Sequence, residues 1–103
     1  MREGRVVVED AQGPLGLGYV AWGPETGART VVCVHGLTRN ARDFDALATD
    51  LAGHGVRVIA VDVAGRGRSD RLVDPHRYDV PVYALQLRAF LAALAITEVD
   101  WIG

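Results

Sequence analysis

Two runs of continuous hydrophobicity constrain the fold of this chain more than any other feature. Residues 30–35 and 56–62 are apolar at successive positions instead of alternating with polar residues. This pattern is typical of strands in a parallel sheet that other elements cover on both faces. Because parallel neighbours need a crossover connection, usually a helix, we expect one between the two runs.

The connection carries a helical pattern. Asn40 is the predicted N-cap, with Asp43 three residues later, and Gly53 and Gly55 are expected to end the helix. One apolar face at helical spacing is predicted, which comprises Phe44, Leu47, Ala48 and Leu51.

A second helix and a further buried strand are predicted in the C-terminal third. The helix covers about residues 80–95, with Asp79 as its cap and Pro81 in the first turn, where proline is accepted. The strand begins at Val99 and continues to Gly103. Strands that alternate with helices indicate a parallel α/β sheet with right-handed crossovers. The apolar face of the helix comprises Leu87, Phe90, Leu91 and Leu94.

The N-terminal residues indicate an antiparallel pair. Residues 5–9 are β-branched and short, and residues 15–22 alternate along the strand. Residues 23–27 are predicted to form a hairpin-type loop because they contain Gly-Pro and a second glycine. We expect both strands at the edge of the sheet, with one buried face. The alternation sets Leu17, Tyr19 and Ala21 against Gly18, Val20 and Trp22.

The first candidate site follows residues 30–35 directly, as His35-Gly36-Leu37-Thr38. In an open α/β sheet this position is at the carboxyl edge, where ligands bind. Gly36 allows a tight turn and leaves room for a substrate carbonyl. The Leu37 N–H would then be free to donate to a developing oxyanion. The alternative is that His35-Gly36 only ends the strand.

The second candidate segment is Asp62-Val63-Ala64-Gly65-Arg66-Gly67-Arg68-Ser69-Asp70. A nucleotide-binding interpretation fails because Asp70 replaces the third glycine of G-x-G-x-x-G and no helix starts there to hold a pyrophosphate. We therefore predict a structural loop. Asp62 and Ser69 tie it down, and Gly65 and Gly67 allow it to fold back over the strand ends.

The remaining polar and titratable residues indicate no further site. Cys33 lies in an apolar run and is expected to be a buried, inert thiol. His54 and His76 are predicted on surface loops, and no metal-binding spacing occurs. The loop arginines are expected in solvent, neutralised locally by Asp70, Asp74 and Asp79; the alternative is that one binds a substrate carboxylate. These arginines are Arg66, Arg68, Arg71 and Arg77.

Length and charge bound the class of protein. A chain of 103 residues forms one domain at most. The net charge of −2 gives no electrostatic basis for binding nucleic acid or an anionic membrane. We see neither a signal peptide nor an apolar stretch long enough to span a membrane, so the cytoplasm is the expected location.

Together these elements resemble the N-terminal portion of the α/β-hydrolase fold family, in its esterase- and lipase-like form. The resemblance covers approximately residues 30–103 of a single partial domain. It rests on the order and spacing of Val32-Cys33-Val34-His35-Gly36, the helix after it, Val58-Ile59-Ala60-Val61-Asp62, Gly65-Arg66-Gly67-Arg68-Ser69 and Trp101-Ile102-Gly103.

The resemblance implies a role for each matched position. Leu37 would supply a backbone oxyanion donor, with His35 and Gly36 as its scaffold, and the third strand would lie beside the fifth. Gly103 would be the first glycine of the G-x-S-x-G nucleophile elbow. Ala64 departs from the pattern, because arginine is common there. The structural loop would comprise Asp62, Gly65, Gly67 and Ser69.

The resemblance also implies what the chain lacks. The nucleophile, acid and base would all follow Gly103, so the fragment alone is predicted to be inactive. The full-length form would be a cofactor- and metal-independent serine hydrolase of small ester-like substrates. Two alternatives stay open. One is a dehalogenase or epoxide hydrolase with an Asp nucleophile. The other is a truncated, non-catalytic module that self-associates through its exposed terminal strand.

Overall fold

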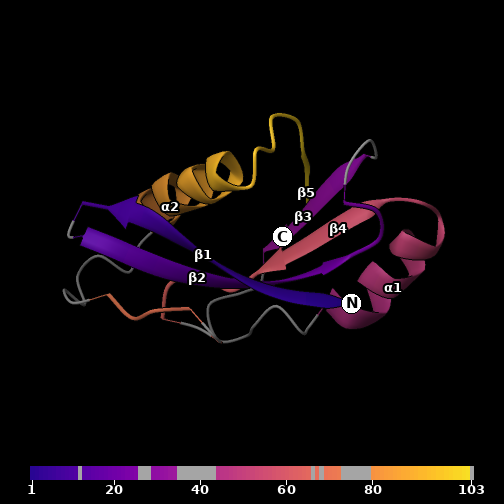
Figure 1. The fold of residues 1–103 in the computed structure, drawn as a ribbon, viewed down its shortest axis with the longest axis horizontal. Helices are drawn as coiled ribbons and strands as arrows, with labels where there is room; N and C mark the ends of the chain where they lie inside the picture. The colour runs from indigo at the N-terminus through magenta and orange to yellow at the C-terminus, as the bar shows by residue number, and fades with distance from the viewer. Residues whose placement is uncertain are drawn as a thin grey trace.

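The computed structural model describes residues 1–11, 13–25, 29–34, 44–65, 67, 69–72 and 80–102. Within this part of the chain, five strands form one mixed sheet in the order β1-β2-β4-β3-β5 (Figure 1). The strands are β1 (Arg2–Asp10), β2 (Gly13–Trp22), β3 (Thr30–Val34), β4 (Arg57–Val61) and β5 (Asp100–Ile102), and the helices are α1 (Asp45–Gly53) and α2 (Val80–Ala93).

The parallel part of the predicted fold is confirmed. β3 pairs in parallel with β4 on one side and with β5 on the other. Val31, Val32 and Cys33 are all buried, because elements cover both faces of the sheet at this strand. An exposed ion pair of 2.5 Å between Arg29 and Asp100 also joins the starts of β3 and β5.

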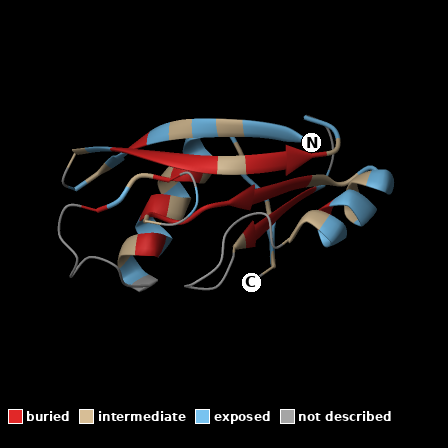
Figure 2. Cartoon of the chain, turned by 90° about the horizontal axis from the view of Figure 1, so that it is seen from below, coloured by how far each residue is buried: buried red, intermediate tan, exposed pale blue. Residues whose placement is uncertain are grey.

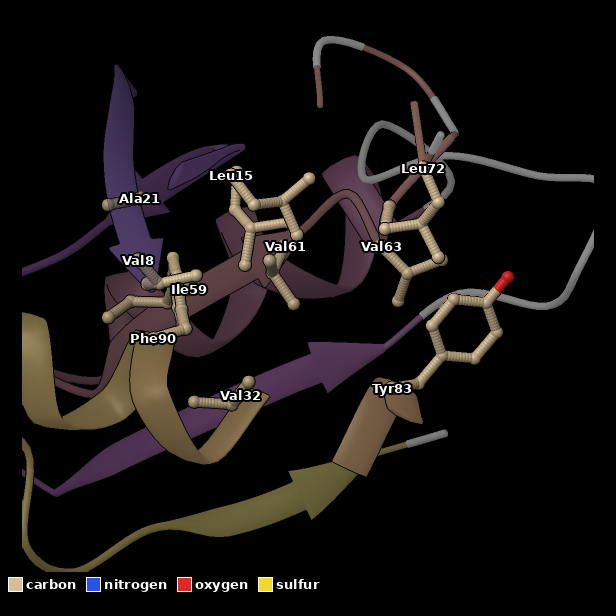
Figure 3. Close-up of a cluster of buried hydrophobic side chains, with 12 residues drawn as sticks. Val8, Leu15, Ala21, Val32, Ile59, Val61, Val63, Leu72, Tyr83 and Phe90 are labelled. Carbon is tan, nitrogen blue, oxygen red and sulfur yellow. The ribbon is translucent and has the colours of Figure 1, made fainter. Parts of the chain in front are cut away.

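Each face of the sheet has its own apolar core. Alternate residues of β4 point to opposite faces, so Ile59 and Val61 enter one core while Val58 and Ala60 enter the other. The first core contains Phe90 of α2, which Figure 3 shows pointing toward Val8 and Ile59. The second core contains Ala48 of α1. The two helices therefore cover opposite faces.

The N-terminal pair is antiparallel, as predicted, but only β1 lies at the edge. β2 pairs with β1 on one side and with β4 on the other, both antiparallel. The prediction of a single buried face is wrong for β2, because Leu17 enters the first core while Val20 and Trp22 enter the second. Figure 2 shows β2 almost entirely buried and β1 largely exposed.

The predicted hairpin-type loop at residues 23–27 is also wrong as a connection between neighbours. It leads from β2 to β3, and β4 lies between these two strands in the sheet. Thr26 and Gly27 are outside the described residues. A Gly-Pro turn signal identifies a chain reversal, but it does not determine whether the flanking strands become partners.

Two details of α1 differ from the prediction. The helix begins at Asp45 with Phe44 in the N-cap position and no side-chain cap, so Asn40 does not cap it. Asn40 and Asp43 are outside the described residues. Leu47 is 40% exposed, because it lies about 100° around the helix from the buried Ala48. The face that packs on the core comprises Phe44, Ala48, Leu51 and Ala52.

The apolar face of α2 is confirmed. Phe90 is fully buried, and Leu87, Leu91 and Leu94 pack against the same core while partly exposed. The Phe90 ring also meets Tyr19 of β2 edge to face, with centroids 5.5 Å apart. The predicted cap, Asp79, is outside the described residues. The helix ends at Ala93 instead of Ala95.

Candidate functional site

The carboxyl ends of the parallel strands meet at one edge of the sheet. Val34 lies opposite Val61, and Cys33 lies opposite Ile102, so β3, β4 and β5 all end at this edge. His35, Gly36 and Leu37 follow β3 in sequence and Gly103 follows β5, but all four are outside the described residues. Their described chain neighbours, Val34 and Ile102, belong to adjacent strands.

Ser69 connects the loop after β4 to β2. Its hydroxyl donates to the carbonyl of Asp62 and accepts a hydrogen bond of 2.9 Å from the Gly18 N–H. The Asp62 N–H donates to the carbonyl of Gly18 at 2.9 Å. Both Asp62 and Ser69 are buried, so these bonds satisfy backbone groups that water does not reach.

The two glycines of this loop have left-handed backbones, with φ of 81° at Gly65 and 50° at Gly67. Other residues rarely adopt this conformation. At Gly67 there is also no space, because an added Cβ would lie 2.3 Å from the Asp62 carboxyl carbon. The Gly65 N–H donates to the carbonyl of Asp70 at 2.8 Å, which closes the loop.

Sequence reasoning missed a second attachment of this loop, which runs through Asp70. The Asp70 carboxylate accepts 2.8 Å from the Gly16 N–H and 2.5 Å from Nη2 of Arg5, and the Asp70 N–H donates 2.8 Å to the Gly16 carbonyl. Asp70 was expected to neutralise arginines of its own loop, but its described partner is Arg5 on β1. No sequence signal links these residues, because they are far apart in the chain.

The hydrogen bond from Arg5, and after it the one from the Gly16 N–H, lower the pKa of Asp70. Gly16 is confined to glycine by the same contact, since an added Cβ would lie 2.1 Å from a terminal nitrogen of Arg5. The loop after β4 is thus fixed to both β1 and β2, and its described start adjoins the carboxyl edge. Of the loop arginines, Arg71 is exposed, whereas Arg66, Arg68 and Arg77 are outside the described residues, as are Asp74 and Asp79.

The remaining titratable groups carry little chemistry. Cys33 is fully buried, as predicted, and burial raises the pKa of its thiol, which keeps it protonated. His54 is exposed at the end of α1, with Nδ1 2.9 Å from the carbonyl oxygen of Asp50. His76 is outside the described residues. Among the residues that the structure describes, no group of His, Cys, Asp and Glu could hold a metal ion.

No helix in the described ranges is long and apolar enough to cross a membrane.

Comparison with known proteins identifies the family. The family model of the α/β hydrolase fold matches residues 29–103. A 3-hydroxybutyrate-oligomer hydrolase of Cupriavidus necator is 46% identical over 93 residues, which cover 87% of this chain and 31% of that protein. A non-heme chloroperoxidase of Streptomyces lividans is 39% identical over 82% of this chain and 30% of its own length.

A solved structure agrees with these sequence matches. An α/β hydrolase from Novosphingobium aromaticivorans superposes with a TM-score of 0.85 at 39% identity, covering 98% of this chain and 35% of that one. The chain thus spans about a third of the length of the relatives that it matches. The family model covers most of the sequence, and the mixed sheet agrees with a solved member along nearly the whole chain. The chain therefore belongs to the α/β hydrolase fold family.

Proposed function

We propose that this chain forms the N-terminal part of a serine-type α/β hydrolase that cleaves an ester or a related carbonyl substrate. One observation carries the proposal, namely the parallel register in which Cys33 lies opposite Ile102. Because of it, the segments that follow β3 and β5 leave the sheet side by side, at the edge where α/β proteins bind ligands.

In this proposal the Leu37 N–H donates to the oxyanion, and His35 and Gly36 shape its turn. Gly103 opens the nucleophile elbow, so the longer protein has a serine two residues after it. That serine attacks the substrate carbonyl carbon while a histidine takes its proton, and the negative charge forms on the carbonyl oxygen. Leu37 and the residue after the serine share that oxyanion through their backbone amides. The loop of Asp62, Gly65, Gly67 and Ser69 supports this edge.

The first substrates to examine are short esters of hydroxy acids, because the relative from Cupriavidus necator is named for hydrolysis of 3-hydroxybutyrate oligomers. The proposed reaction uses no cofactor or metal, since the serine, its base and two amides supply the chemistry. Only a small-molecule substrate is proposed as a partner, with neither nucleic acid nor membrane, and the proposed location is the cytoplasm.

The test uses the longer protein and two substitutions at one position. Leu37→Pro removes the amide hydrogen, whereas Leu37→Ala retains it. We expect Leu37→Pro to lower kcat on a chromogenic butyrate ester by about 10²–10³-fold, the usual effect of losing one oxyanion donor. Leu37→Ala should change kcat by only about a few fold, because its backbone donor remains.

Equal losses in the two variants would show that the side chain, not the amide, matters at this position. The 103-residue chain, assayed beside the longer protein, should show no turnover and no labelling by a serine-directed phosphonate. Turnover by the short chain would contradict a nucleophile beyond Gly103. An aspartate two residues after Gly103 would instead support the dehalogenase or epoxide hydrolase alternative.

A second candidate is a non-catalytic module that self-associates through its terminal strand. It is favoured by Trp101 of β5, which is 50% exposed. Trp101 borders an apolar groove of about 410 Å³ between β5 and α2, with Val34, Leu87 and Leu91 among its lining residues. Exposed apolar surface beside an edge strand favours association with another chain.

A further inference from the structure

A cavity of about 720 Å³ lies at the amino ends of the parallel strands, opposite the candidate active site. Its floor includes Thr30 and Arg57, the first residues of β3 and β4, which lie opposite each other in the sheet. Tyr19 of β2 and the turn after α2 form further walls. The volume is within the range of about 300–1,000 Å³ that is usual for small-molecule sites.

Arg57 is the polar group of this cavity with unused hydrogen-bonding capacity. Its backbone N–H donates 2.8 Å to the Arg29 carbonyl, which fixes the start of β4. Its Nε is buried and has no hydrogen-bond partner among the described residues. The other lining arginine, Arg2, is different, since it pairs with Glu25 at 3.3 Å. Buried donors are nearly always satisfied, so an unused one in a cavity wall indicates a missing acceptor.

The lining defines the chemistry of that acceptor. A guanidinium presents a planar fork of donors that matches a carboxylate. Glu3 and Glu25 also line the cavity, so a single negative charge is favoured over the two of a phosphate dianion. Leu94 and Ile96 provide an apolar wall for a short hydrocarbon body.

We propose that this cavity binds small monocarboxylates, with Arg57 as the carboxylate anchor. The site is separate from the oxyanion chemistry proposed above, because it lies at the other end of the same strands. It therefore does not depend on the identity of the nucleophile.

The experiment titrates the full chain with butyrate at constant ionic strength and uses uncharged butyramide as the matched ligand. Butyrate should shift the Nε–Hε resonance of Arg57 saturably, while butyramide should not. By calorimetry, Arg57→Gln should weaken butyrate binding about tenfold or more, because it loses charge-assisted hydrogen bonds. Arg57→Lys should be intermediate, since it keeps the charge without the planar fork.

Two further variants sharpen the result. Glu25→Gln releases Arg2 and removes a negative charge, so it should tighten butyrate binding. Arg88→Gln removes an exposed arginine outside this cavity and should leave the affinity unchanged. If Arg57→Gln fails to fold, the wild-type resonance and the gain in Glu25→Gln still decide the outcome. Equal binding of butyrate and butyramide, an unchanged affinity in Arg57→Gln, or no saturable shift would overturn the proposal.

Discussion

Asp70 shows how much a single residue contributes when its partners are distant in the sequence. Its carboxylate joins Arg5 of β1 to the Gly16 amide of β2, and its own N–H returns to Gly16. The loop after β4 is thereby held on two strands at once. Because the carboxylate is ionised in these contacts, the strength of the attachment depends on pH.

The pKa of Asp70 is lowered in the folded chain, first by the hydrogen bond from Arg5. The resulting stabilisation is therefore complete above the ordinary pKa of 3.8 and is lost as the pH falls below it toward the folded value. We expect Asp70→Asn to lower the free energy of unfolding at pH 7 by about 0.5–1 kcal/mol, since the pair is partly exposed and screened. Urea unfolding at pH 7 and pH 3 measures the change.

The difference between wild type and Asp70→Asn should shrink at pH 3. Glu98→Gln, which removes an exposed carboxylate, serves as the control and should have little effect at either pH. Arg5→Gln should be non-additive with Asp70→Asn, because both remove the same contact. An undiminished difference at pH 3 would mean that the charge of Asp70 contributes nothing to the attachment.

At the scale of elements, the two helices end in the same hydrogen-bonding pattern. After α1, the N–H groups of Gly55 and Val56 donate to the carbonyls of Ala52 and Leu51. After α2, Ala95 and Ile96 repeat these bonds to Ala92 and Leu91. The third residue from each carbonyl pair is left-handed, with φ of 81° at Gly55 and 57° at Ala95. Glycine is the usual residue at this position, so Ala95 is strained.

The strain predicts opposite effects of reciprocal substitutions. Ala95→Gly should raise the free energy of unfolding by about 0.5–1 kcal/mol, because relief of the left-handed strain exceeds the added flexibility of the unfolded chain. Gly55→Ala should lower it by about 1 kcal/mol from backbone strain alone, since nothing lies within 4 Å of the added Cβ. Chemical denaturation measures both. Changes of the same sign would contradict a shared backbone cause.

At the scale of the whole molecule, the half-exposed Trp101 predicts self-association of the 103-residue chain. We expect its mass in sedimentation equilibrium to rise with concentration, because β5 and the adjoining groove offer apolar surface to a second copy. Trp101→Ser should weaken the association by about tenfold, the loss of one large buried contact. Leu85→Ser, which changes an exposed residue outside the groove, should not. A monomer at all concentrations would rule out this surface.

The success of the sequence predictions followed how local each signal is. The parallel strands were predictable because continuous hydrophobicity is written into residues 30–34 and 57–61 themselves. Phe90 was assigned to a core face by helical spacing, and Leu47 was misassigned because spacing alone does not fix the centre of that face. Similarly, the edge position of β1 was predictable, whereas the second buried face of β2 required knowledge of β4 as its neighbour.

The sequence by itself determined the alternation of strands and helices, the membership of the α/β hydrolase fold family, and the glycines at which the loop after β4 turns. These features depend on periodicity and backbone freedom, which are properties of short segments. Only the tertiary structure decided that β4 lies between β2 and β3, that Arg5 meets Asp70, and that Arg57 lines a cavity without a partner among the described residues. Such contacts join segments far apart in the chain, and they form only when the packing of both sheet faces fixes the strand order.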